Sequence, residues 1–215
     1  IVYGALVALV QRDFKFVIGY SSVSHMGFVL LGLMTLTQIG LSGAVLQMFS
    51  HGIIAGLLFG VVGRMVYDRA HTRELGALQA MNLHRVLPFA AVTFIIGSLA
   101  SMGLPGFSGF VAELQVIIGA WQAFPIFALL AGIGIIIGVA YSLRALLQAF
   151  FAEKTAAPLA HPGHFTPITM PERIGAIVLM ATTLIVGLYP RLLLDLITPS
   201  LNSPLMQPLW KGAGG

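Results

Sequence analysis

The chain has 215 residues, of which 58% are hydrophobic and 8% are charged, with a formal net charge of +4 and no cysteine. Ordinary globular domains carry about 25% charged residues, so this composition excludes a water-soluble domain, a nucleic-acid binder and a disulfide scaffold. The missing thiols also exclude iron–sulfur clusters and zinc–thiolate sites on this chain, and the mean hydropathy of +0.96 predicts a polytopic, all-α membrane protein.

Long apolar runs predict the membrane spans. A helix needs about 20 apolar residues to cross the hydrocarbon core. The chain opens inside an apolar run, which we interpret as the end of a helix that begins upstream. We then expect helices up to residue 150, a cytoplasmic linker over 151–172, a final span over 173–196 and a tail over 197–215. The predicted spans after the opening run are Val17–Thr37, Leu41–Val66, Val86–Gln122, Pro125–Phe150 and Ile174–Leu196.

Basic residues gather on one side of these spans. When the connections are placed on alternating sides, nine of the 11 lysines and arginines fall on one side, leaving only Arg191 and Lys211 on the other. The positive-inside rule makes the richer side cytoplasmic or its equivalent. The nine residues are Arg12, Lys15, Arg64, Arg69, Arg73, Arg85, Arg144, Lys154 and Arg173.

The stretch Val86–Gln122 is too long for one straight crossing and too short for two. Its middle contains Gly103, Pro105, Gly106 and Gly109. Proline removes a backbone donor, and such a break is tolerated in lipid only where the freed carbonyls are buried in protein or face a wet cavity. We therefore predict one discontinuous helix rather than the alternative, a simple proline kink. Interrupted helices of this kind mark ion pathways in transporters.

Three ionisable side chains lie deep inside predicted spans: His25, His51 and Glu113. At about 1.5 Å per residue, each lies roughly 12–15 Å from a membrane face, which is close to the midplane. A charge at that depth costs about 2.5–3.5 kcal/mol on insertion scales, so we expect it to face the bundle interior. Histidine changes charge near neutral pH and can donate and accept at once. The three together predict a proton relay.

Simpler interpretations remain for each of these groups. A histidine at the midplane can have a purely structural role, in which it hydrogen-bonds a neighbouring helix. Lys15 lies near the end of its span, where a lysine side chain normally reaches to the membrane surface, although a mechanistic role stays open.

Four longer motifs stand out in the chain: YSSVSHMGF (Tyr20–Phe28), QMFSHG (Gln47–Gly52), AHTREL (Ala70–Leu75) and GLPGFSGFVAEL (Gly103–Leu114). Together they resemble the antiporter-like subunit M, or chain 4 type, of NADH-quinone oxidoreductase, found in respiratory complex I and its photosynthetic relatives. The resemblance implies two inverted repeats, each with one broken helix, of which this chain supplies the second repeat. It also implies that Glu113 is the proton-carrying carboxylate, since the two sister subunits place lysines in this region.

The resemblance further implies a translocase subunit that binds no cofactor itself. Quinone, iron–sulfur clusters and any FMN would belong to partner subunits, and other membrane subunits, including sister antiporter-like ones, would surround the chain in a bacterial inner or thylakoid membrane. We expect protons to enter near Lys15 or His25, to pass His51 and to leave by way of Glu113. The alternatives are an Mrp-type sodium/proton antiporter subunit, a membrane subunit of an energy-converting hydrogenase, and a structural scaffold.

Overall fold

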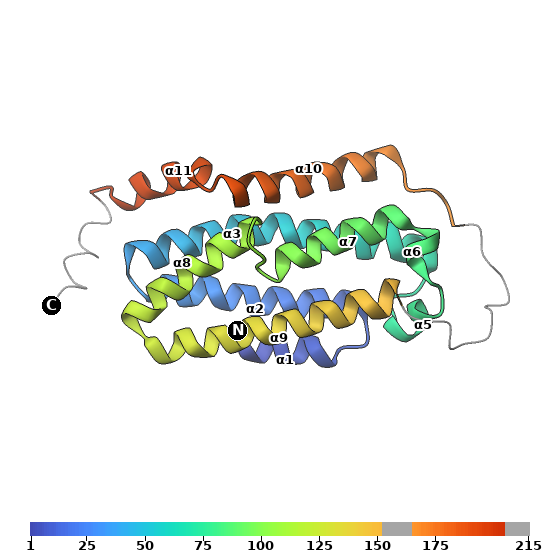
Figure 1. The fold of residues 1–215 in the computed structure, drawn as a ribbon, viewed down its shortest axis with the longest axis horizontal. Helices are drawn as coiled ribbons and strands as arrows, with labels where there is room; N and C mark the ends of the chain where they lie inside the picture. The colour runs from blue at the N-terminus through green and yellow to red at the C-terminus, as the bar shows by residue number, and fades with distance from the viewer. Residues whose placement is uncertain (152–164, 205–215) are drawn as a thin grey trace.

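The computed structural model describes residues 1–151 and 165–204. They form the predicted all-α bundle, and no β-strand occurs in this part of the chain. Figure 1 shows the long helices lying along one common axis, with α5 and α6 at one end and α11 at the other. The elements are α1 (Val2–Val10), α2 (Phe14–Met34), α3 (Gln38–Phe59), η1 (Gly60–Tyr67), α4 (Asp68–Ala70), α5 (Leu75–Gln79), α6 (Leu83–Val86), α7 (Pro88–Ser101), α8 (Ser108–Ala123), α9 (Pro125–Phe150), α10 (Met170–Leu188) and α11 (Arg191–Leu201).

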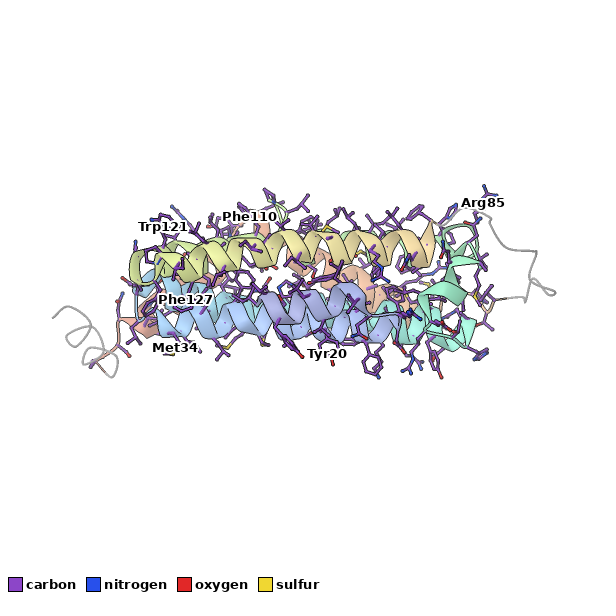
Figure 2. All side chains as sticks on the ribbon, turned by 90° about the horizontal axis from the view of Figure 1, so that it is seen from below. Tyr20, Met34, Arg85, Phe110, Trp121 and Phe127 are labelled. Carbon is purple, nitrogen blue, oxygen red and sulfur yellow. The ribbon has the colours of Figure 1, made fainter. Side chains whose placement is uncertain are left out.

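Basic side chains lie at the end of the bundle that carries α5 and α6. We call it the arginine-rich end; Figure 2 shows Arg85 there, with Met34 and Trp121 toward the opposite end. The connection between α1 and α2 is fixed to this end by paired backbone bonds. The N–H of Phe14 donates to the carbonyl of Arg73 (2.8 Å), and the N–H of Leu75 donates to that of Arg12 (2.9 Å).

Helix α2 begins at Phe14, before the predicted start at Val17, because Asp13 caps it. The Asp13 Oδ1 atom accepts hydrogen bonds from the backbone N–H groups of Lys15 (2.8 Å) and Phe16 (3.3 Å). A capping carboxylate satisfies donors that have no partner within the helix. Lys15 therefore lies in the first turn of α2.

Helix α3 continues as a wider, π-helical segment, η1, which runs to Tyr67. The stretch between the predicted spans Leu41–Val66 and Val86–Gln122 contains the short helices α4 and α5 and most of α6. Four apolar helical segments of the described residues are long enough to span a membrane: Phe14–Met34, Gln38–Ala70, Pro125–Phe150 and Met170–Leu188.

The predicted long span over 86–122 is a broken helix, α7 followed by α8. Gly103, with φ at +68°, ends α7: its N–H donates to the carbonyl of Ala100 (3.3 Å), and the N–H of Leu104 donates to that of Leu99 (3.2 Å). These two bonds and the left-handed residue form a Schellman motif, which commonly ends a helix.

A tight turn follows at once and starts the second half. Pro105 and Gly106 occupy its central positions, Gly106 has φ at +101°, and the N–H of Phe107 donates to the carbonyl of Leu104 (3.2 Å). Proline followed by a residue with positive φ is typical of a type II turn. Glycine therefore ends the first half-helix, and proline belongs to the turn after it, so the proline-kink alternative is wrong.

The expected single span over 173–196 is two helices, α10 and α11, separated at Tyr189 and Pro190. Tyr189 has φ at −130° and ψ at 70°, outside the helical region. The residue before a proline is sterically pushed out of the helical region, which explains the stop. Helix α11 then extends to Leu201, into the predicted tail; residues 152–164 of the predicted linker and 205–215 of that tail lie outside the described residues.

Helix α10 is anchored at the arginine-rich end by Arg69. The Nη2 atom of Arg69 lies 2.8 Å from Glu172 Oε2, and its guanidinium also donates to the carbonyls of Thr166 (2.7 Å) and Pro167 (3.0 Å). The Arg69 side chain is 4% exposed. A buried guanidinium with several oriented acceptors fixes the chain that precedes α10 as well as the helix itself.

Candidate proton-relay site

The structure brings the three predicted midplane residues together from three helices. His25 lies on α2, His51 on α3 and Glu113 on α8. The Nδ1 atom of His25 lies 3.1 Å from Glu113 Oε1, and the rings of His25 and His51 are 5.3 Å apart between centroids. Glu113 is 5% exposed and His25 is 8% exposed. A carboxylate is thus held inside the bundle with an imidazole in direct contact.

His25 contacts both halves of the broken helix. Its Nε2 atom lies 3.1 Å from the hydroxyl of Ser101, the last residue of α7, while its Nδ1 atom faces Glu113 in α8. The two ring nitrogens differ in which carries the proton, and the partner of each decides the tautomer. The imidazole can therefore take up a proton on the Ser101 side and give one to the carboxylate on the other side.

Gln47 gives His25 a second partner at Nδ1. Its Nε2 atom lies 3.4 Å from His25 Nδ1, and its side chain is 2% exposed. An amide N–H can only donate, so this bond requires an unprotonated Nδ1, whereas a bond from Nδ1 to the Glu113 carboxylate requires a protonated one. Gln47 Oε1 has no hydrogen-bond partner among the described residues. The site thus offers two hydrogen-bond patterns that differ by the position of one proton.

Two small cavities lie beside this cluster and share lining residues. The first, about 10 Å³, is lined by His25, Glu113, Ser101 and Tyr141; the second, also about 10 Å³, shares Ser101 and Tyr141. A space of this size corresponds to about one water molecule, and hydroxyl groups supply the partners that such a molecule needs. Further hydroxyls lining the second cavity belong to Ser21, Ser98 and Ser142.

The predicted site residues are not all in one place. Lys15 is exposed on the first turn of α2, ten residues before His25, which corresponds to about 15 Å along the helix. The expected order places His51 between His25 and Glu113. In the structure His25 contacts Glu113 directly, and the ring of His51 lies 5.3 Å from that of His25. Of the four residues predicted to form the break, Gly103, Pro105 and Gly106 lie in the connection between α7 and α8, whereas Gly109 is the second residue of α8.

Several polar residues of the site were not singled out in the sequence. Ser101 and Tyr141 are buried, and each contacts or lines the space around His25. In the sequence, each of them is only a hydroxyl group within an apolar span. Such hydroxyls often hydrogen-bond neighbouring helices, so they do not by themselves indicate a functional site. No group of three or more potential metal-ligating side chains occurs in residues 1–151 and 165–204.

Comparisons with known proteins find related membrane subunits. A family model described as "NADH:quinone oxidoreductase/Mrp antiporter, TM" matches residues 1–138. The chain is 42% identical over 200 residues to NADH-quinone oxidoreductase subunit M of Rhodobacter capsulatus, covering 93% of this chain and 38% of that relative. It therefore spans about two fifths of the length of the curated relatives that it matches.

Solved structures give the same fold. A chain of respiratory complex I from Thermus thermophilus with bound NADH superposes with a TM-score of 0.85 at 31% identity, covering 100% of this chain and 43% of that one. A chain of the Mrp complex from Dietzia sp. DQ12-45-1b superposes with a TM-score of 0.78 at 25% identity, covering 98% and 46%.

Proposed function

This chain belongs to the NADH:quinone oxidoreductase/Mrp antiporter family of membrane subunits, and from that premise we propose that it moves protons across the membrane for a complex I-like quinone oxidoreductase. The observation that carries the proposal is the contact of the buried Glu113 carboxylate with His25, 3.1 Å apart beside a broken helix. Electron transfer to quinone, with its iron–sulfur clusters and any FMN, takes place in partner subunits. Sister antiporter-like subunits adjoin this one.

The proton step is an exchange between His25 and Glu113. A proton arrives at Nε2 of His25 from the Ser101 side, and the imidazole becomes positively charged. The proton on Nδ1 then passes to Glu113 Oε1, so the ring returns to neutral with its proton on Nε2 and the carboxylate becomes a carboxylic acid. Gln47 stabilises this second state, because its amide N–H donates to the freed Nδ1. One proton has moved from the Ser101 side to the Glu113 side.

The supply of protons comes from the arginine-rich end in this proposal. Of the two cavities that share Ser101 and Tyr141, one is lined by His25 and the other by Val17, near the start of α2, so waters placed in them would support a path from that end. Lys15 lies at the same end, on the first turn of α2. His51, with its ring 5.3 Å from that of His25, tunes or extends the relay through the charge that it carries when protonated. The signal that drives each cycle originates in the partner subunits that reduce quinone.

The test is Glu113→Gln in the full-length subunit, assembled in its parent complex and reconstituted into liposomes. Glutamine keeps the size and polarity of the side chain but cannot exchange a proton. We expect quinone-linked proton pumping to fall by about a hundredfold, in the range seen when a positioned acid or base is removed. The matched control is Glu74→Gln at the exposed N-terminus of α5, which should pump normally. Near-normal pumping by Glu113→Gln in an assembled complex would reduce the chain to a scaffold.

A second function, sodium/proton exchange, is favoured by the match to the Mrp complex. The same liposomes separate the two functions. Pumping that requires an electron donor and ignores sodium supports the oxidoreductase. Proton flux that follows a sodium gradient without any donor supports the exchanger.

A further inference from the structure

Three hydroxyl groups in a row join α10, the start of α8 and α3. Thr183 Oγ1 lies 2.9 Å from Ser108 Oγ, and Ser108 Oγ lies 2.5 Å from Ser50 Oγ on α3. All three side chains have 0% exposure. Buried hydroxyls are costly without partners, so each depends on the next. This series of hydroxyl groups ends at Thr183, inside packed protein. It joins the three helices at Ser108, the first residue of α8.

The same face of α10 also contacts the turn in the break directly. Gly187 lies four residues after Thr183, so the two positions share one face of the helix. A Cβ atom at position 187 would overlap the carbonyl oxygen of Gly106 and the backbone of Phe107. Because these are backbone atoms, they cannot move aside as the tip of a side chain can. Only a glycine lets α10 lie this close to the break.

Apolar packing continues this contact toward the acid. Val186, on the same side of α10, is buried in a cluster with Leu46 and with Ala112, the neighbour of Glu113. The other end of α10 is fixed by the Arg69–Glu172 pair at the arginine-rich end. Helix α10 is thus held at both ends and cannot shift along α8 without breaking contacts.

We infer that Thr183 and Gly187 are positioning residues for Glu113. They hold the first turn of α8 against α10, and Glu113 follows Ser108 by five residues, about 7.5 Å along one continuous helix. The place where α8 starts therefore sets where the carboxylate meets His25. The inference rests on the proposed function, in which this carboxylate carries the proton.

The first experiment compares Thr183→Val with Thr183→Ser in the assembled complex in liposomes. Valine keeps the shape of threonine but removes the hydroxyl, whereas serine keeps the hydroxyl. We expect quinone-linked proton pumping to fall about tenfold in Thr183→Val, since small displacements of a reacting group have effects of this size or larger, and to stay near normal in Thr183→Ser. The matched control is Thr182→Val, because the Thr182 hydroxyl donates within its own helix, to the carbonyl of Val178 (2.8 Å).

The second measurement reports on Glu113 itself. The infrared band of its protonated carboxyl group is assigned by its loss in Glu113→Gln. We expect the band to shift in Thr183→Val and in Gly187→Ala but not in Thr182→Val or Gly175→Ala, because Gly175 faces open space on the same helix. This band tests the positioning even if Glu113→Gln pumps normally, so failure of the proposed function and failure of this inference are distinguishable.

Three results would overturn the inference. In the first, Thr183→Val pumps normally and its carboxyl band does not move. In the second, the serine and valine variants lose pumping equally, which assigns the loss to packing at position 183 rather than to the hydroxyl. In the third, only the valine variant fails to assemble, which makes the hydroxyl a purely structural group.

Discussion

The carboxylate of Glu113 lies directly over Gly103. A Cβ atom added at position 103 would stand 2.6 Å from Glu113 Oε2, and Gly103 has φ at +68°. The residue that ends the first half-helix therefore also leaves the space that the acid of the second half occupies. Gly109 has a related role, because a Cβ there would lie 2.7 Å from the carbonyl oxygen of Ala100.

Gly103→Ala should therefore damage the relay more than the fold. Alanine at a left-handed position costs about 1–2 kcal/mol, and the added methyl group must also push the carboxylate away from His25. We expect pumping per electron to fall about tenfold or more in the assembled complex. Gly106→Ala is the control: its φ of +101° brings at least the same backbone cost, but no atom lies within 4 Å of the added Cβ. An equal loss in both variants would assign the effect to backbone strain.

His25→Gln should lose more activity than His51→Gln. His25 bridges Ser101 and Glu113 through its two nitrogens, which a single amide cannot do while also passing a proton. His51 contacts the ring of His25 and not the carboxylate, so its loss leaves the direct path intact. We expect about a hundredfold loss for His25→Gln and about tenfold for His51→Gln, measured as initial pumping rates. The reverse ranking would place His51 in the path.

Gln47→Leu should slow the relay without abolishing it. The substitution keeps the volume of the side chain but removes the N–H that donates to His25 Nδ1 in the state with a protonated carboxyl group. A bond of this kind contributes about 1 kcal/mol, which corresponds to a loss of pumping of about fivefold. The control is Gln148→Leu at a half-buried glutamine on a different helix, α9, and it should pump normally. A larger loss in the control would show a general cost of removing glutamines from the bundle.

Two of the arginine pairs at the arginine-rich end should contribute differently to stability. Arg69 is 4% exposed beside Glu172, whereas Arg64 is 72% exposed beside Asp68. Removing one partner of a buried pair leaves an uncompensated charge, so Arg69→Ala should lower the free energy of unfolding by about 3 kcal/mol. Arg64→Ala should cost at most about 1 kcal/mol, as exposed pairs do. Thermal unfolding of the full-length subunit in detergent measures both, and equal losses would mean that Arg69 does not anchor α10.

The sequence predicted the fold class and the broken helix because each depends on composition or local chemistry. Apolar run length gave the spans, and the glycines around Pro105 predicted the interruption. Depth along each helix also predicted that His25, His51 and Glu113 share one level. Rotation about the helix axes is set by packing between distant segments, and the sequence alone does not contain it. For this reason the direct contact between His25 and Glu113 was not predicted.

The errors at helix ends have local causes. The start of α2 was placed too late because Asp13 was not read as a cap, although a carboxylate before an apolar run is a common start signal. The last span was predicted as continuous although Pro190 interrupts it. The bond between Ser101 and His25 joins residues 76 positions apart, so no local pattern could have predicted it.

The connection over residues 102–107 is a bend that backbone hydrogen bonds fix between α7 and α8. The backbone bonds of the motif at Gly103 and of the turn at Pro105 are all made within residues 99–107, so the bend is fixed locally. A bend fixed by local bonds sets the angle between the two half-helices. It thereby sets the directions from which Ser101 and Glu113 approach the two ring nitrogens of His25.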